Sequence, residues 1–188
     1  MIKSIILEND RVRLSPLTLD NYTNLHSVAA EHKLIQYSPS DIETPAALRR
    51  YVEIALEQQK QRSSLPFIIY DKKSMAFAGS TRYMNIDYKN KVLEIGSTWI
   101  GEKFQGTGLN SQMKNLLLNH AFDMLGFEKV SFRIDERNLQ SRKAVEKLGA
   151  VLEGILRENV YLLDGYKRNT CCYGILKNEW GKFLRQDK

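Results

Sequence analysis

Short stretches in which apolar and polar residues alternate predict strands along the chain. In residues 11–18 (RVRLSPLT), Val12 and Leu14 occupy one side and two arginines the other. This two-residue period is that of a half-buried strand. Four later segments are also interpreted as strands, namely residues 64–71, 74–88, 91–100 and 128–135. Polar turn residues separate the second and third of these, so we expect them to pair as antiparallel neighbours.

Between these strands, apolar residues recur three or four positions apart, as they do on one face of a helix. A first helix is expected over about 18–31. A second is expected over 42–61, where Thr44 is the cap and Pro45 takes the first helical position. Three further helices are expected over residues 108–125, 138–149 and 178–186.

The last part of the chain predicts a hairpin. Residues 150–176 contain two strand-like segments around an Asp164-Gly165 turn, the strongest hairpin signal in the sequence. No internal repeat or low-complexity linker interrupts the chain, so one domain over residues 1–188 is expected. The order of elements indicates a mixed α/β or α+β sheet flanked by helices.

Composition and charge narrow the possible functions only slightly. The chain is 43% hydrophobic and 27% charged, which is ordinary for a globular protein. A net charge of +6 is compatible with nucleic acid, an acidic protein or a polyphosphate as ligand. Lysines and arginines form no long run, which disfavours nucleic acid.

The same data bear on location and on metal binding. The apolar run near the amino terminus is only Ile-Ile-Leu, and no stretch reaches the roughly 18 apolar residues of a membrane span. We therefore expect a cytoplasmic protein without membrane contact. The two adjacent cysteines, Cys171 and Cys172, have no metal-binding spacing, and the three histidines show none either. No metal is expected, and the cysteines are expected to be inert on an interior strand.

A glycine-containing loop, residues 104–110 (FQGTGLN), precedes the third helix. Free N–H groups and the helix dipole make a helix start attractive to anions, and glycines let a phosphate approach the backbone. A tight turn with positive φ is the alternative interpretation. The Walker motif is excluded because Leu109-Asn110 stands where it needs Lys-Ser/Thr, and a dinucleotide fingerprint is excluded because the third glycine is missing.

Residues 105–110 resemble the pyrophosphate loop of the GCN5-related N-acetyltransferases, the GNAT superfamily, although Asn110 departs from the motif Gln/Arg-x-x-Gly-x-Gly/Ala. The preceding segment, LEIGSTWI, resembles the fourth strand of that family, including Glu94 and Gly96. Residues 138–149 resemble its Asn-x-x-Ser-x-x-Ala-x-x-x-Leu-Gly segment.

The final hairpin extends this resemblance to one branch of the superfamily. Glu153-Gly154 and Asp164-Gly165-x-x-Arg168 are similar to the branch that includes the ribosomal-protein N-terminal acetyltransferases of the Rim type. The resemblance implies a single GNAT-like domain with a central mixed, mostly antiparallel sheet flanked by helices. It also implies a splay between the fourth strand (91–100) and the fifth (128–135).

The resemblance further implies acetyl-CoA as co-substrate and direct attack by a primary amine, either a protein N-terminal amine or a small molecule. Backbone N–H groups of the loop would hold the pyrophosphate, and the fourth strand would pair with the pantetheine arm. The implied cofactor-binding residues are Thr98, Trp99, Ile100, Gln105, Gly106, Thr107, Gly108, Leu109, Asn110, Asn138 and Ser141. The helices over 18–61 and the hairpin would wall the acceptor site, and their mixed charges favour no acceptor class.

By the same resemblance Glu94 is the expected general base, because partial burial raises a carboxylate pKa toward the operating pH. The alternative is a solvated acid on a strand. Ser141 is the expected acid for the departing thiolate, and the alternative is a polar residue in the first turn of a helix. Asn138 either holds the pantetheine amide or caps that helix.

Several further assignments stay open. A hairpin tyrosine (Tyr161, Tyr166 or Tyr173) is an alternative acid, although packing is the simpler interpretation. His120 is expected at the edge of the core, and Arg168 at a solvated surface position. A CoA-binding module without activity is the main alternative to an enzyme, and both a monomer and a homodimer are compatible with the sequence.

Overall fold

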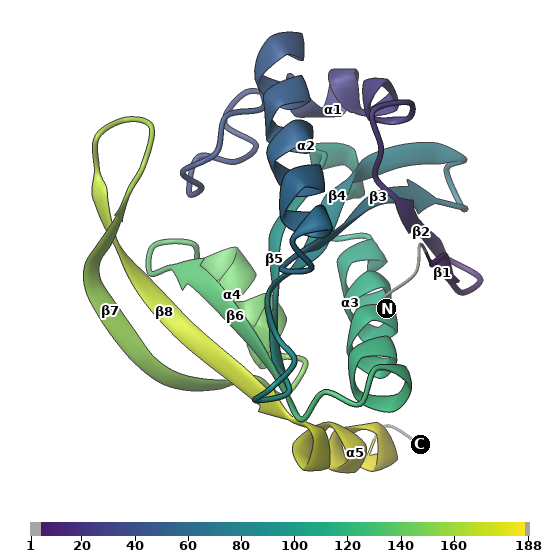
Figure 1. The fold of residues 1–188 in the computed structure, drawn as a ribbon, viewed down its shortest axis with the longest axis vertical. Helices are drawn as coiled ribbons and strands as arrows, with labels where there is room; N and C mark the ends of the chain where they lie inside the picture. The colour runs from purple at the N-terminus through teal and green to yellow at the C-terminus, as the bar shows by residue number, and fades with distance from the viewer. Residues whose placement is uncertain (1–4, 187–188) are drawn as a thin grey trace.

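The computed structural model describes residues 5–186. Its strands form one sheet in the order β1-β2-β3-β4-β5-β6-β8-β7 (Figure 1). The strands are β1 (Leu7–Glu8), β2 (Val12–Pro16), β3 (Leu65–Asp71), β4 (Ala76–Asp87), β5 (Val92–Ile100), β6 (Lys129–Asp135), β7 (Val151–Tyr161) and β8 (Lys167–Leu176). The helices are η1 (Tyr22–Leu25), α1 (His26–Ala29), α2 (Pro45–Lys60), η2 (Glu102–Phe104), α3 (Leu109–Asn119), η3 (His120–Met124), α4 (Leu139–Glu146) and α5 (Lys177–Gln186).

The sheet is mixed and mostly antiparallel, as the sequence predicts. The pair β5–β6 is parallel and short, since only residues 92–94 align with residues 129–131. Beyond Glu94 the two strands continue without pairing, β5 to Ile100 and β6 to Asp135. This confirms the expected splay between the strand over 91–100 and the strand over 128–135.

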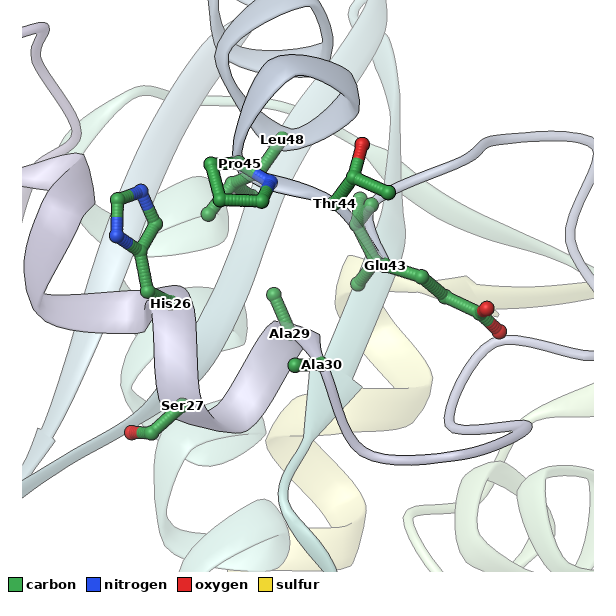
Figure 2. A pocket seen from close by; sticks show the side chains of 9 residues that line it. His26, Ser27, Ala29, Ala30, Glu43, Thr44, Pro45 and Leu48 are labelled. Carbon is green, nitrogen blue, oxygen red and sulfur yellow. The ribbon is translucent and has the colours of Figure 1, made fainter.

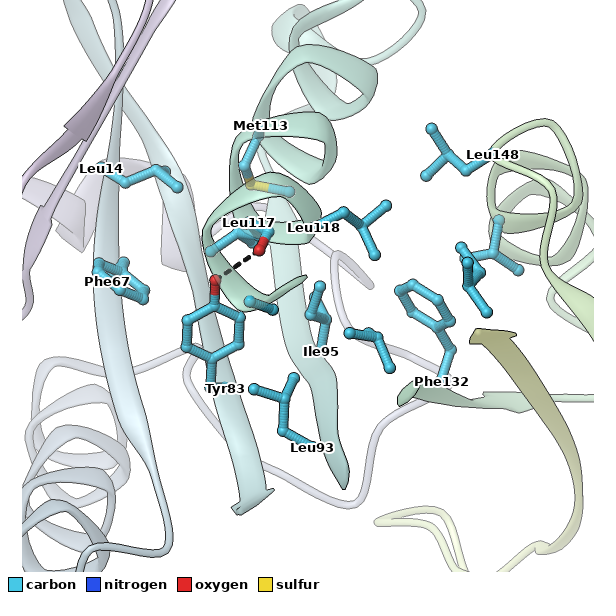
Figure 3. Packing of buried hydrophobic residues seen from close by; sticks show 14 of the residues in the cluster. Leu14, Phe67, Tyr83, Leu93, Ile95, Met113, Leu117, Leu118, Phe132 and Leu148 are labelled. Carbon is cyan, nitrogen blue, oxygen red and sulfur yellow. Dashed lines mark hydrogen bonds between the residues drawn. The ribbon is translucent and has the colours of Figure 1, made fainter. Parts of the chain in front are cut away.

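Helices cover the two faces of the sheet unequally. On one face, α3 and α4 pack with the inner residues of β2–β6 and β8 in the larger core cluster, part of which Figure 3 shows. On the other face, η1, α1 and α2 pack over Ile68 and Trp99 in a smaller cluster. The α2 side of β6 and β8 has no such helix in either cluster, and the β7–β8 hairpin curves away from α2 (Figure 1). A polar sheet face is therefore left beside the splay.

The first expected helix, over about 18–31, is wrong in extent. The chain instead makes the short elements η1 and α1 and then a series of turns to residue 37. The side chain of Asn21 accepts a hydrogen bond from the Thr18 N–H (2.9 Å) and donates one to the Pro16 carbonyl (2.9 Å). Such local side-chain bonds compete with a helical ladder, which explains the late start. The expected cap of α2 is confirmed, because Thr44 accepts from the Ala47 N–H at 3.1 Å.

The third expected helix changes its winding near its end. After Asn119 the backbone forms the π-helical segment η3, in which the Leu125 N–H bonds the His120 carbonyl. There the buried Tyr83 phenol donates to the Leu117 carbonyl (2.6 Å) and lies 3.2 Å from His120 Nδ1 (Figure 3). A side chain from the sheet thus engages the helix where its ladder shifts. His120 is 5% exposed and so lies in the core rather than at its edge.

Candidate active site

The loop before α3 has the backbone that its glycines predict. Gly106 and Gly108 have φ angles of +71° and +85°, which only glycine adopts readily. A Cβ atom at either position would meet no heavy atom within 4 Å, so open space adjoins both residues. Gly108 is the N-cap of α3, and no side chain caps that helix. The loop therefore exposes bare backbone at the helix start.

The loop also carries unpaired hydrogen-bond donors. The N–H groups of residues 106–111 have no hydrogen-bond acceptor within the described part of the chain. The N–H of Gln105 is already used, since it donates to the Glu102 carbonyl at 3.0 Å. The free donors thus run one residue later than the 105–110 expected from the sequence. With the partial positive charge of the helix start, this row of donors suits a phosphate or pyrophosphate.

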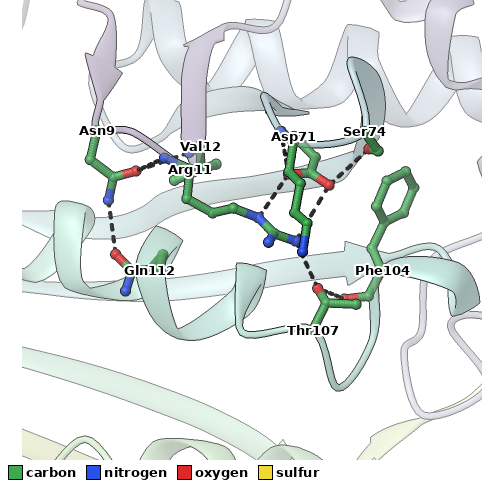
Figure 4. A network of polar contacts seen from close by, with 9 residues as sticks. Asn9, Arg11, Val12, Asp71, Ser74, Phe104, Thr107 and Gln112 are labelled. Carbon is green, nitrogen blue, oxygen red and sulfur yellow. Dashed lines mark hydrogen bonds and ion pairs between the residues drawn. The ribbon is translucent and has the colours of Figure 1, made fainter.

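Gln105 and Thr107 fix the shape of the loop. The Gln105 side chain donates from Nε2 to the Ile100 carbonyl at 3.0 Å. Thr107 Oγ1 donates to the Phe104 carbonyl at 2.7 Å and accepts from Arg11 Nη2 at 3.2 Å (Figure 4). These side chains hold the turn from within, so the row of N–H groups is preorganised.

A buried ion pair braces Arg11 from behind. Arg11 Nε lies 2.8 Å from Asp71 Oδ1, an ion-pair contact outside hydrogen-bond geometry, and the Asp71 side chain is 3% exposed. Asp71 also accepts from Ser74 Oγ at 2.8 Å (Figure 4). Because Asp71 is the last residue of β3, the loop is tied to the far side of the sheet. The sequence analysis did not find this link, since Arg11 and Asp71 are distant from the loop in sequence.

A hollow of about 550 Å³ lies beside the loop and the start of α3. Its lining comes from the β1–β2 turn and the helix start, namely Asn9, Asp10, Arg11, Thr107, Gly108, Ser111 and Gln112. A second pocket of about 320 Å³ lies between α1 and the start of α2 (Figure 2). None of the site residues expected from the sequence lines this second pocket.

The second half of β5 offers an open edge beside the splay. In the described residues, no position of β5 from Ile95 onward pairs with β6. A bulge falls here, because Arg82 pairs with Gly96 but Ser80 pairs with Trp99. Ser97 within the bulge has φ +46°, and its carbonyl accepts from the Tyr51 hydroxyl at 3.3 Å. An extended ligand has room to pair along this edge.

The side chains of the three expected pantetheine-binding residues are turned to other partners. Thr98 Oγ1 shares a hydrogen bond with Thr81 Oγ1 at 2.8 Å. Trp99 is 4% exposed and donates to the Tyr51 hydroxyl at 3.3 Å. The Ile100 carbonyl already accepts from Gln105. Only the remaining backbone groups of this segment are thus free for a ligand.

Glu94 lies on the α2 side of the sheet, opposite its core-facing neighbours on β5, and is 5% exposed. Its Oε2 accepts from Asn85 Nδ2 at 2.9 Å and lies 3.6 Å from Arg133 Nε. Burial raises the pKa of this carboxyl, and the Asn85 hydrogen bond and the arginine charges oppose the rise. A Cβ at Gly96 would stand 3.1 Å from Glu94 Oε1, so the glycine leaves room for the carboxylate.

Ser141 and Asn138 lie across the sheet from Glu94. Asn138 Oδ1 accepts from the Ser141 N–H at 3.0 Å and so caps α4. The Ser141 hydroxyl is partly exposed and has no hydrogen bond in the described residues. Because α4 packs into the α3-side core, Ser141 and Glu94 belong to opposite faces of the sheet. Both faces meet at the splay, where the sheet is open.

The hairpin tyrosines have other contacts. The buried Tyr173 hydroxyl donates to Glu146 Oε1 at 2.6 Å and accepts from Arg142 Nε at 3.0 Å, and its pKa is raised, mainly by desolvation. Tyr161 is 65% exposed. Tyr166 lies under the guanidinium of Arg137, whose Cζ is 3.7 Å from the ring centroid.

The expected solvated position of Arg168 is wrong. Arg168 is 9% exposed, and its Nη1 donates to the Tyr37 carbonyl at 2.7 Å. The segment before α2 thus covers this side chain, which its place after a turn does not reveal. The cysteines lie on the interior strand β8, where Cys171 is buried and Cys172 partly buried.

Comparison with known proteins gives one consistent family. A family model described as an acetyltransferase (GNAT) domain matches residues 11–151. YdaF of Bacillus subtilis (strain 168), provisionally named a ribosomal N-acetyltransferase, is 30% identical over 113 residues. That match covers 60% of this chain and 59% of YdaF, so the chain spans about three fifths of the length of this relative.

Two solved structures extend the likeness over nearly the whole chain. A GCN5-related N-acetyltransferase from Brucella melitensis superposes with a TM-score of 0.86 at 27% identity, over 97% of this chain and 83% of the other. A provisionally named acetyltransferase from T. thermophilus gives 0.85 at 32% identity, over 96% and 94%. Among residues 5–186, no helix has the length and apolar character needed to cross a bilayer.

Proposed function

The chain belongs to the GNAT acetyltransferase family, and we propose that it transfers the acetyl group of acetyl-CoA to a primary amine. The observation that carries this proposal is the row of free N–H groups at residues 106–111, next to the open edge of β5. The first feature suits a pyrophosphate and the second an extended pantetheine arm. Acetyl-CoA contains both groups.

The residues of the chain divide the binding of this co-substrate. Backbone N–H groups from Gly106 to Asn110, with that of Ser111, face the pyrophosphate, while Gln105 shapes the loop through its bond to Ile100. Backbone groups among residues 98–100 face the pantetheine, since their side chains are occupied. Asn138 fixes the start of α4, which places Ser141.

Glu94 acts as the general base in this proposal. It takes a proton from the ammonium form of the acceptor, directly or through a water, and leaves a neutral amine. The amine nitrogen attacks the thioester carbonyl carbon, and the carbon–sulfur bond breaks. The Ser141 hydroxyl gives its proton to the departing sulfur, and the proton removed from the amine replaces it. The raised pKa of Glu94 brings a carboxylate closer to the range in which general bases work well.

The acceptor is a protein N-terminal amine or an amine of a small molecule. The name of YdaF supports the first of these, because it points to ribosomal proteins. A cytoplasmic location, a single domain and a monomer or homodimer stay predictions from the sequence.

A thermal-shift titration with acetyl-CoA, CoA, ATP and NAD tests the donor site. A ligand that binds only the folded state at 100 times its Kd adds about 2.7 kcal/mol to the free energy of unfolding, a readily visible shift. We expect stabilisation by acetyl-CoA and CoA alone, followed by amine-dependent release of free thiol. Stabilisation by ATP or NAD instead would refute the assignment of the loop, and CoA binding without turnover of any amine would favour a silent module.

A further inference from the structure

The polar sheet face beside the splay is built from alternate residues of β6 and β8. Asp135 aligns with Thr170 and Arg133 with Cys172, so these four side chains share one face. The intervening residues, such as Phe132 and Tyr173, belong to the core on the opposite side. Because Ser131 on the same face of β6 aligns with Glu94 on β5, this surface continues directly to the proposed general base.

Most charges on this face already have partners. Asp135 accepts from the N–H and Nε of Arg137 at 2.9 and 3.1 Å, and from its Nη2 at 2.8 Å. Arg137 is in turn held between Tyr37 and Tyr166, at 5.5 and 3.7 Å from the two ring centroids. These contacts hold Asp135 and Arg137 together as a neutral pair. They also place the segment before α2 opposite the hairpin turn.

Arg168 is the exception. Its Nε donates to Thr170 Oγ1 at 3.2 Å and its Nη1 to the Tyr37 carbonyl at 2.7 Å. No carboxylate of the described residues lies within ion-pair distance of it, and its Nη2 has no hydrogen bond there. The charges of Asp135 and Glu94 act on it from farther away. Arg168 is thus a buried cation, fixed by neutral oxygens, with donors to spare.

A buried cation without a direct counter-charge is costly unless a partner supplies one. A guanidinium held on one edge presents its free N–H groups in the fork geometry that suits a carboxylate. From this we infer that the acceptor is an amine that also carries a carboxylate, and that Arg168 binds the carboxylate while Glu94 receives the amine. This inference rests on the proposed acetyl transfer and narrows its acceptor.

The charges facing the groove agree with such an acceptor. Arg133, half exposed and 3.6 Å from Glu94, adds a second cation to the same face. A polyamine would bring further positive charge against Arg133 and Arg168, where like charges repel. An amino acid, or an acidic amino-terminal segment of a protein, brings one charge of each sign.

Matched acceptor pairs test the inference with the unaltered protein. One pair is 4-aminobutyrate and its carboxamide, and another is the peptides Ser-Asp-Ala-Ala and Ser-Asn-Ala-Ala, both C-terminally amidated. A charge-assisted bond to Arg168 gives the acidic member of a pair a kcat/KM roughly 10- to 100-fold higher. The pair that shows the preference tells a free small acid from an acidic protein terminus. Equal kcat/KM values within both pairs, or a preference for spermidine, would overturn the inference and leave the proposed transfer standing.

Variants then assign the preference to Arg168. Arg168→Gln is expected to abolish the preference by lowering kcat/KM for the acidic acceptor alone, and Arg168→Lys to restore part of it. Arg157→Gln, on the exposed strand β7, is the matched control and should keep the full preference. A preference unchanged in Arg168→Gln would overturn the role of Arg168. The wild-type pairs decide the acceptor class even if that variant does not fold, and absence of turnover with every amine would refute the proposed transfer and this inference together.

Discussion

The donor and acceptor sides of the proposed site are built in opposite ways. The donor side consists of consecutive backbone N–H groups at residues 106–111, and no side chain in that run is needed to point at the ligand. The acceptor side consists of side chains from distant positions, Tyr37, Glu94, Asp135 and Arg168, which the sheet register brings together. One side is a local feature of the chain, and the other exists only in the folded sheet.

The two sides should therefore respond differently to substitution. A backbone cradle fails when its conformation changes, and it loses affinity for the co-substrate. A side-chain constellation fails when a functional group is removed, and it loses the chemical step or the recognition of the amine. Separating KM for acetyl-CoA from kcat and from KM for the amine distinguishes the two kinds of failure.

The largest effect is expected on the acceptor side, from Glu94→Gln. The amide keeps the shape and the contact with Asn85 but cannot take a proton. We expect kcat to fall about 10²- to 10⁴-fold, with the Kd for acetyl-CoA unchanged. Steady-state kinetics and a CoA titration measure both quantities. A decrease of less than threefold would mean that another group, or bulk water, removes the proton.

The pH dependence of the parent protein sharpens this test. Because burial raises the pKa of Glu94, activity should fall as the pH drops through that raised pKa, and Glu94→Gln should lack this limb. The sign for stability is the opposite. The folded state keeps the proton to a higher pH than the unfolded chain, so ionisation costs stability as the pH rises from 4.5 through the folded pKa. Glu94→Gln should therefore be at least as stable as the parent at pH 8, as a thermal melt can show.

An intermediate effect is expected on the donor side, from Gly108→Ala. A left-handed conformation costs an alanine about 1–2 kcal/mol, so the loop should shift and misalign its N–H groups. We expect KM for acetyl-CoA to rise about tenfold, equivalent to about 1.4 kcal/mol, with little change in kcat at saturation. Gly126→Ala is the control, since Gly126 has φ +72° and equally open surroundings outside the loop. An equal rise of KM in both variants would point to general destabilisation.

The smallest effect is expected from Thr107→Val, which removes the hydrogen bonds to Arg11 and Phe104 but leaves the backbone donors in place. A looser loop should raise KM for acetyl-CoA by about threefold, since an exposed hydrogen bond contributes roughly 0.5–1.5 kcal/mol. Thr107→Ser should restore the parent value. A change in the KM for the amine instead would contradict the assignment of this loop to the donor side.

The fold was largely accessible from the sequence, and the departures from the expectation have local causes. Strand alternation, the Thr44-Pro45 cap and the glycine loop all act within a few residues, and the structure has each of them. The failed prediction of a helix over 18–31 also has a short-range cause, because the Asn21 side chain bonds the backbone on both sides. Propensity rules missed it since they do not weigh such competing bonds.

The sequence by itself determined the donor loop, the order of strands and the resemblance that singled out Glu94 and Ser141. Those features depend on neighbouring residues and on periodic burial. Only the tertiary structure decided that Arg11 braces the loop through Asp71, that Asn85 holds Glu94, and that the segment at Tyr37 buries Arg168. The physical reason is that burial and ion pairing depend on which side chains meet across strands, and sequence separation says nothing of those distances.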